Sequence, residues 1–237
     1  MNKRSLKDLL YEQVSRIGKA VSSPKRLEVL ELLAQGEKSV EMLANELSID
    51  IKLTSAHLKA LKEARLVTFR RNGKYMVYRL SGSDVSTLWV VMRQVAEEHL
   101  LELQQALSQM AADPAKLAPI GREVLLEQAR RGDIILIDVR PQQEYQSGHL
   151  PFARSMPAAE IEQHLAELQV DKEIVAYCRG PFCLFSEEVV NLLTSKGYRA
   201  RKFLDGVSEW VTAGLPLERV AQEQAAVLET DARQGVP

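Results

Sequence analysis

The sequence predicts two domains: a mainly α winged helix-turn-helix, then an α/β domain with a parallel sheet. Three observations predict this arrangement. The first half has helical segments that end in two strand-like runs joined at Asn72-Gly73, and the second half alternates continuous apolar runs with helical segments. Residues 1–82 carry 16 Lys and Arg against 9 Asp and Glu, whereas the remainder carries 15 against 23. This asymmetry predicts a polyanionic partner for the first half alone.

The first half begins with four helical segments. Apolar residues recur at helical spacing over residues 6–21, and the segment SSPKRLEVLELLAQG has Ser23 as a cap and Pro24 in its first turn. A short third helix, SVEMLANEL, opens at Ser39, and after the break SID a fourth covers IKLTSAHLKALKEARL. The apolar residues of the fourth helix that we expect to face inward are Leu53, Leu58 and Leu61.

The runs LVTFRR and KYMVYRL follow as strands, and Asn-Gly between them is a strong signal for a β-hairpin. Two helices separated by a short turn and followed by a hairpin make a winged helix-turn-helix. Residues 51–80 contain eight Lys and Arg against one acid, Glu63. That local charge is the kind that contacts with DNA phosphates need.

DNA contacts are expected from two elements. The N-terminal residues of the second helix of such a motif enter the major groove. On this helix the predicted contacts are Lys52, Thr54, Ser55, His57 and Lys59. On the wing, which would grip the DNA backbone, they are Arg70, Arg71, Asn72 and Lys74. For His57, packing within the helical motif is an equally good interpretation.

Over about residues 6–80, this pattern resembles the arsenic-repressor (ArsR/SmtB) family of bacterial regulators. The resemblance implies a homodimer formed by the helices at either end of the module. A twofold dimer would bind an inverted-repeat operator in double-stranded DNA, with half-sites about one helical turn apart. The segment DVSTLWVVMRQVAEEHLLELQQALSQMA is expected to be a long helix of that contact, or else to pack against its own domain.

Metal-sensing members of this family carry a cysteine pair in the helix that reads SVEMLANEL here, or Asp and His on the last helix. In this chain the segment SVEMLANEL contains no cysteine, and Asp84 is not followed by a histidine two residues later. His99 with Glu102 offers half of such a set. We therefore expect no metal and no cofactor, and we expect the sensor to lie elsewhere in the chain.

In the second half, IILID and EIVAY are continuous apolar runs that suit buried parallel strands, and RARKFL is a third candidate. The segments REVLLEQARRGD, IEQHLAEL and LFSEEVVNLLTSKG are helical. Alternating strands and helices predict an α/β sheet whose site lies at the carboxyl ends of the strands.

The stretch YCRGPFCLFSEE holds the only two cysteines of the chain, Cys178 and Cys183. It lies where a predicted strand ends and a helix begins, a place rich in backbone N–H groups and the positive end of a helix dipole. Such a place stabilises a thiolate, and Arg179 adds a positive charge beside it. A thiolate is the nucleophile that sulfur chemistry needs.

Three stretches, LIDVRPQQEYQSGHLPFARSMP, IVAYCRG and LDGVSEWVTAGLPLE, resemble a single rhodanese domain over about residues 122–218. The resemblance implies that Cys178 is the catalytic cysteine, which takes up sulfane sulfur as a persulfide. It also implies structural support of the sulfur site by Asp138, Arg140, Glu144 and His149.

The loop departs from the usual pattern Cys-Arg-x-Gly-x-Arg. It lacks the second arginine, and Pro181 removes one backbone N–H. In exchange it has Cys183, which could lie within the ~7 Å Cα separation of a disulfide and resolve a Cys178 persulfide. The alternative is that Cys183 is a small buried apolar residue.

The fusion predicts a DNA-binding regulator, a repressor by this hypothesis, that senses or transfers sulfur from a small sulfur-donor molecule. Two alternatives stay open: a sulfurtransferase with an accessory DNA-binding domain, and an arsenite-responsive repressor that uses the two thiols. Few cysteines and the lack of a signal or membrane segment predict a cytoplasmic protein with no membrane partner. The expected boundaries are 1–112, a linker at 113–120, 121–219 and a polar tail at 220–237.

Overall fold

The computed structural model describes residues 2–110 and 113–220. The chain divides into two compact units, Met1–Val95 and Ala96–Pro237, each described by itself. Most of the predicted polar tail, residues 221–237, lies outside the described residues. No helix of the described part is both long and apolar enough to cross a bilayer.

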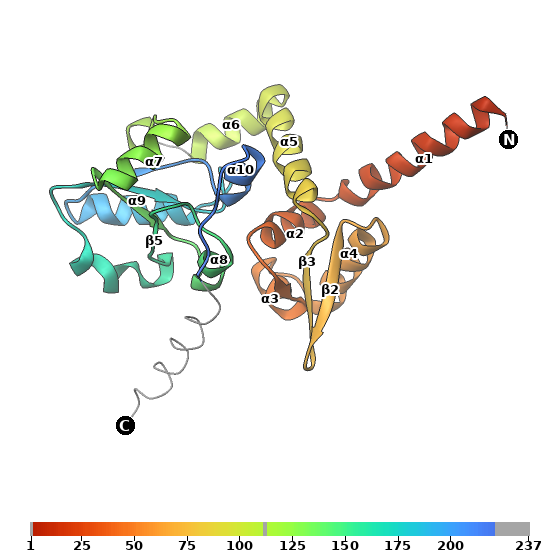
Figure 1. Cartoon of the computed structure of the whole chain (residues 1–237), viewed down its shortest axis with the longest axis horizontal. Coiled ribbons are helices and arrows are strands. Elements are labelled where there is room, and N and C mark those ends of the chain that lie inside the picture. Colours follow the sequence, from red (N-terminus) through yellow and green to blue (C-terminus); the bar gives the residue numbers. More distant parts are fainter. Residues whose placement is uncertain (1, 111–112, 221–237) are drawn as a thin grey trace. The chain divides into compact units, whose positions relative to one another are not determined.

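The first unit is a winged helix-turn-helix (Figure 1). Its elements are α1 (Lys3–Val21), α2 (Pro24–Ala34), β1 (Lys38–Ser39), α3 (Val40–Glu46), α4 (Ile51–Glu63), β2 (Val67–Asn72), β3 (Tyr75–Leu80) and α5 (Ser83–His99), which continues into the second unit. The strands pair antiparallel in the order β1-β3-β2. The strand β1, which the sequence did not indicate, adds a short third strand to the hairpin.

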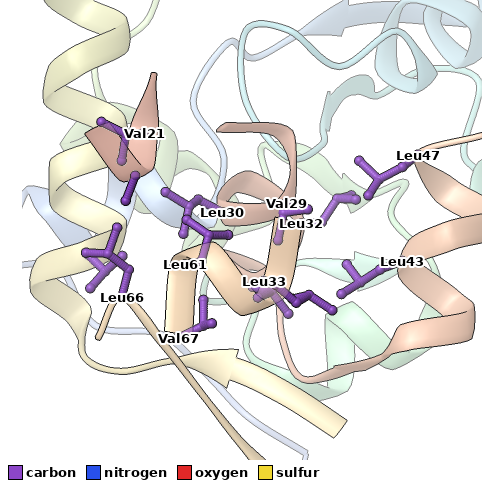
Figure 2. Close-up of a cluster of buried hydrophobic side chains, with 13 residues drawn as sticks. Val21, Val29, Leu30, Leu32, Leu33, Leu43, Leu47, Leu61, Leu66 and Val67 are labelled. Carbon is purple, nitrogen blue, oxygen red and sulfur yellow. The ribbon is translucent and has the colours of Figure 1, made fainter. Parts of the chain in front are cut away.

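The core of this unit gathers apolar residues from α1, α2, α3, α4 and the hairpin (Figure 2). Leu58 and Leu61 have no solvent exposure, as predicted, but Leu53 is 44% exposed and does not face inward. Leu58 and Leu61 are three positions apart, so they share one helix face, whereas Leu53 is five positions before Leu58 and lies off that face. Pro24 opens α2 as predicted, although Ser23 makes no side-chain cap bond.

The long helix expected from residue 84 onward is two helices in the structure. The first, α5, ends at His99, and α6 covers Leu101–Met110, with none of the α6 residues buried. The Gln104 amide donates hydrogen bonds to the carbonyls of Glu97 and Glu98, which lie in the last turn of α5. These bonds satisfy carbonyl groups that a helix end leaves unpaired.

The second unit is an α/β domain with a four-stranded parallel sheet in the order β5-β4-β6-β7. Its elements after α6 are η1 (Pro114–Lys116), α7 (Arg122–Arg131), β4 (Ile134–Asp138), α8 (Gln142–Ser147), β5 (Arg154–Ser155), η2 (Ala158–Glu167), β6 (Glu173–Tyr177), α9 (Phe185–Ser195), β7 (Arg199–Lys202) and α10 (Val207–Thr212). The two apolar runs of the sequence are β4 and β6, and the third candidate, RARKFL, contains β7.

The sheet is covered on both faces, which explains why its two central strands, β4 and β6, are continuous apolar runs. Along β4, Ile135 and Ile137 pack into a cluster with residues of η2 and α9. The alternate residues Ile134 and Leu136 pack into a second cluster with residues of α7 and α10. The carboxyl ends of β4 and β6, at Asp138 and Tyr177, are direct neighbours, so their loops meet at one edge.

Candidate functional site

The helix-turn-helix is capped at both of its helices. The Ser39 hydroxyl accepts a hydrogen bond from Met42 N–H at the start of α3, as the sequence predicted. At the start of α4 the Asp50 carboxylate accepts from Leu53 N–H at 2.9 Å. Between the helices Ser48 adopts a left-handed conformation with φ 52°. These local bonds satisfy N–H groups that the start of each helix leaves free, and they stabilise both helix starts.

Four of the five residues predicted on α4 are accessible to a ligand. Lys52, Ser55 and Lys59 are exposed, and His57 is partly exposed. Thr54 is fully buried, and its hydroxyl donates to the Asp50 carbonyl at 2.9 Å. Thr54 therefore supports the helix start from inside and does not present a group to DNA.

Burial and two nearby cations lower the pKa of His57. Burial is the largest cause, and the nearby charges of Arg26 and Lys25 act in the same direction. A phosphate that approached the ring would act in the opposite direction and raise this pKa.

The wing is the β2–β3 hairpin, which projects from the helices of its unit in Figure 1. All four predicted wing residues, Arg70, Arg71, Asn72 and Lys74, are exposed. The turn is one residue later than Asn72-Gly73, because Asn72 still pairs with Tyr75 and the two loop residues are Gly73 and Lys74. Gly73 takes the positive φ of 58° that this turn requires.

A carboxylate that the sequence reasoning missed holds the base of the wing. Arg70 Nη2 lies 2.9 Å from Glu37 Oε2, and Arg79 Nη1 lies 3.7 Å from Glu37 Oε1. Glu37 directly precedes β1, whose pairing with β3 brings it beside the hairpin. The strand β1 has only two residues, which is too short to leave a periodic signal in the sequence.

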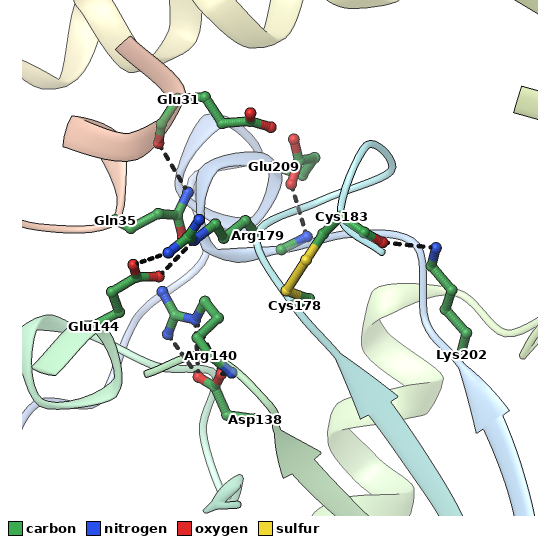
Figure 3. The surroundings of a disulfide bond; sticks show 11 residues. Glu31, Gln35, Asp138, Arg140, Glu144, Cys178, Arg179, Cys183, Lys202 and Glu209 are labelled. Carbon is green, nitrogen blue, oxygen red and sulfur yellow. Dashed lines mark hydrogen bonds and ion pairs between the residues drawn. A yellow bond between two sulfur atoms is a disulfide. The ribbon is translucent and has the colours of Figure 1, made fainter. Parts of the chain in front are cut away.

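In the second unit, the sulfur loop (residues 178–184) lies between the end of β6 and the start of α9, as predicted. Cys178 directly follows β6 and is 1% exposed, whereas Cys183 is partly buried. The two cysteines form a disulfide with a Cα–Cα separation of 6.2 Å (Figure 3). Gly180, at φ 141°, turns the chain, and Cys183 N–H donates to the Gly180 carbonyl at 3.1 Å.

Arg179 forms an ion pair with Glu144. Its Nε lies 3.0 Å from Glu144 Oε2, and its Nη2 bonds the other carboxylate oxygen. The Glu144 side chain is only 2% exposed, so the pair is largely shielded from solvent. Glu144 therefore partly balances the charge of Arg179. Figure 3 shows Arg179 directed toward Glu144 and away from the disulfide.

Asp138 and Arg140 form a second, fully buried pair beneath the loop. Burial acts to lower the pKa of Arg140, but the Asp138 carboxylate outweighs it and raises that pKa above the ordinary value. Arg140 Nη2 also donates to the Gly148 carbonyl, and Tyr177 Oη donates to Asp138 Oδ2 at 2.6 Å. Burial, followed by the Asp138 charge, raises the pKa of Tyr177.

The His149 ring stacks on Tyr145 at 3.7 Å, and its Nδ1 lies 2.9 Å from the Tyr145 carbonyl. The backbone of His149 pairs with that of Glu218, which ties the end of the domain to the same region. These contacts are consistent with supporting roles for the four residues that the resemblance singled out.

Three further residues border the sulfur loop that the sequence reasoning did not single out. A Cβ on Gly206 would lie 2.5 Å from the Arg179 carbonyl carbon, so only glycine fits. Glu209 is 3% exposed, and its carboxylate accepts from Gly206 N–H at 2.7 Å. Lys202 is also 3% exposed, and its Nζ donates to the Cys183 carbonyl at 3.2 Å. The glycine and glutamate lie within LDGVSEW, one of the stretches that carried the rhodanese resemblance.

The residues 2–110 and 113–220 contain no group of three or more His, Cys, Asp and Glu side chains that could hold a metal ion. The candidate sites of the described residues are a basic helix with its wing in the first unit and a cysteine pair in the second.

Comparison with known proteins agrees with both units. The family model of the bacterial regulatory protein arsR family matches residues 23–68, and that of the rhodanese-like domain matches residues 122–213. The HTH-type transcriptional regulator Rv0324 of Mycobacterium tuberculosis is 41% identical over 215 residues, which cover 91% of this chain and 94% of that protein. The chain belongs to the arsR family of transcriptional regulators. It carries a rhodanese-like domain behind its DNA-binding winged helix-turn-helix.

Two further proteins are similar to parts of this arsR-family regulator. A sulfurtransferase of Allochromatium vinosum is 30% identical over 86 residues, which cover 36% of this chain and 78% of that protein. The homodimeric winged helix-turn-helix DNA-binding domain Mb0332 of Mycobacterium bovis is 42% identical in sequence. The match covers 43% of this chain and 93% of the Mb0332 domain, with a TM-score of 0.40.

Proposed function

We propose that this regulator is a repressor that binds an inverted-repeat operator as a homodimer and responds to reactive sulfur through a persulfide on Cys178. Cys183 resolves the persulfide. The observation that carries the proposal is that the only two cysteines of the sequence lie 6.2 Å apart at their Cα atoms, at the carboxyl edge of the sheet. Their positions allow a sulfur signal to be stored as a bond that changes the loop.

The chemistry balances with an inorganic polysulfide as the donor. The Cys178 thiolate attacks a terminal sulfane sulfur, the adjacent S–S bond of the donor breaks, and a polysulfide one sulfur shorter leaves with the electron pair. The Cys183 thiolate then attacks Cys178 Sγ, and hydrosulfide leaves. The two cysteines are oxidised to a disulfide, and the sulfane sulfur is reduced. A cellular thiol restores the dithiol by exchange.

The charges around the loop favour a donor that has no oxyanion group. Arg179 is ion-paired with Glu144 and Arg140 with Asp138. The position that the second loop arginine takes in the usual pattern holds Cys183 here. Neither arginine is held in a geometry aimed at a dianion above Cys178. Thiosulfate has sulfonate oxygens that would be bound best by a paired donor such as a free guanidinium, whereas a polysulfide has no such group.

The dimer part of the proposal is supported by exposed apolar residues on α1. Leu6, Leu9, Leu10, Tyr11 and Val14 are 42–69% exposed on one helix. Isolated exposed apolar residues are ordinary, but five within nine positions of one helix are a concentration of the kind that marks an interface. A second copy of this helix would cover it in a twofold arrangement.

The experiment is a DNA-binding measurement on the full chain, first reduced and then treated with polysulfide, with the bound sulfur counted by mass spectrometry. We expect the reduced protein to bind and polysulfide to weaken binding about tenfold, a coupling of ordinary size. Cys178→Ser should bind DNA and ignore polysulfide. Cys183→Ser should retain one extra sulfur atom, whereas the wild type should lose two hydrogens. Unchanged DNA binding with Cys178 fully modified would disprove the sensor.

The similarity to a sulfurtransferase favours a second candidate, a sulfur-transfer enzyme with a DNA-binding domain. Repeated turnover of thiosulfate or a persulfide, with cyanide or a thiol as acceptor, would support it. Cys183→Ser separates the two functions, because an enzyme that transfers sulfur from Cys178 to an external acceptor does not need Cys183. In the same mass measurement, a gain of one arsenic atom after arsenite treatment would instead identify arsenite capture by the two thiols.

A further inference from the structure

Lys202 is a buried lysine at the edge of the sulfur loop. Its exposure is 3%, and its Nζ donates a hydrogen bond to the Cys183 carbonyl at 3.2 Å (Figure 3). Lysine is rarely buried to this extent, because desolvating an ammonium is costly unless its hydrogen bonds are used. Burial lowers the pKa of Lys202, and the opposing charge of Glu187 only reduces that effect.

The position of Lys202 is fixed by the sheet. Lys202 is the last residue of β7 and is the register partner of Ala176 in β6, two residues before Cys178. The next residue, Phe203, donates its N–H to the Ala176 carbonyl at 2.8 Å. Cys178 and the base of Lys202 are therefore held by neighbouring strands, whereas Cys183 lies on the far side of a turning loop.

The hydrogen bond from Lys202 thus connects the Cys183 backbone to β7, the strand that pairs with the one preceding Cys178. We propose that Lys202 is a positioning residue for the cysteine pair, which holds the Cys183 backbone so that its sulfur stays within reach of Cys178. The effect is one of effective concentration, because a restrained Cys183 attacks as an intramolecular group. The importance of this for sulfur sensing rests on the proposed function, but the restraint itself does not.

The restraint is measured in a glutathione redox buffer, in which the dithiol and oxidised glutathione exchange to the disulfide and two reduced glutathiones. We expect Lys202→Met to lower the equilibrium constant for forming the Cys178–Cys183 disulfide about tenfold. Lys202→Arg, which keeps a cationic donor, should recover most of it. Lys202→Gln serves as a second loss variant should the methionine variant fold poorly, as judged by thermal unfolding of the reduced protein.

Lys172→Met is the matched control. Lys172 also donates from Nζ to a carbonyl, that of Gly132 at 2.8 Å, but it precedes β6 at the end of the strand opposite Cys178. Its loss should leave the glutathione equilibrium unchanged. Equal equilibrium constants for wild type, Lys202→Met and Lys202→Gln would overturn the proposal. Because the assay contains neither DNA nor polysulfide, its outcome is separate from that of the sensor proposal.

Discussion

Arg140 Nη2 lies 2.6 Å from Asp138 Oδ2, and neither side chain has any exposure to solvent. The same carboxylate accepts the Tyr177 hydroxyl, and that hydroxyl accepts from Leu150 N–H at 3.0 Å. Asp138 and Tyr177 end the two central strands, so this network joins the strands directly below Cys178. The sulfur loop therefore begins directly above a buried network of hydrogen bonds and one ion pair.

Asp138→Asn should destabilise the protein severely. Substitution leaves the Arg140 guanidinium buried without a countercharge, a change that costs about 3–5 kcal/mol in free energy of unfolding. Urea denaturation followed by circular dichroism measures it. Glu127→Gln is the control, since Glu127 pairs with Arg130 and Arg131 on the solvent side of the same domain. Equal urea midpoints for the two variants would contradict the assignment.

The sequence predicted the central strands of the sheet and the place of Cys178, but it did not predict the roles of several polar side chains. The strands β4 and β6 are continuous apolar runs, so their existence, their parallel pairing and the place of Cys178 follow from pattern. Lys202 and Glu37 gave no such signal, because the role of each depends on register between strands distant in sequence. Thr54 was misassigned for a related reason: a polar residue at a helix start is equally suited to a ligand or to bonding its own backbone.

Glu37→Gln should strengthen DNA binding. The Glu37 carboxylate is paired with Arg70 and Arg79 at the base of the wing, and its removal releases both cations for phosphate contacts. Each added phosphate contact steepens the plot of log affinity against log salt by about 0.9. Fluorescence anisotropy with duplex DNA at several salt concentrations measures both quantities. Glu41→Gln, on the first turn of α3, serves as the charge-matched control. An unchanged salt slope would show that the two arginines are not limited by Glu37.

Gly206→Ala should displace the sulfur loop. A Cβ at this position would lie 2.6 Å from the Cys178 carbonyl oxygen and 2.5 Å from the Arg179 carbonyl carbon, and both are backbone atoms that cannot rotate away. We expect a loss of about 1–3 kcal/mol in free energy of unfolding, as for other overpacking substitutions, and slower disulfide formation. Gly18→Ala, in the interior of α1, has nothing within 4 Å of its Cβ and should stabilise its helix. Normal disulfide kinetics in the Gly206 variant would refute the close approach.

His57 should couple DNA binding to proton uptake. Burial, Arg26 and Lys25 hold its pKa below the ordinary value of 6.5, so the unfolded chain takes up the proton first as the pH falls. The contribution of His57 to stability is therefore present above pH 6.5 and is lost as the pH falls through its folded pKa. A phosphate beside the ring acts in the opposite sense and raises the pKa, so DNA affinity should increase as the pH is lowered toward 6.

An NMR titration of the His57 ring, with and without duplex DNA, measures the shift. His57→Gln should lose this pH dependence while keeping its dependence on salt. If DNA leaves the pKa of His57 where it is in the unbound protein, the ring lies away from the phosphates and belongs to the packing of α4.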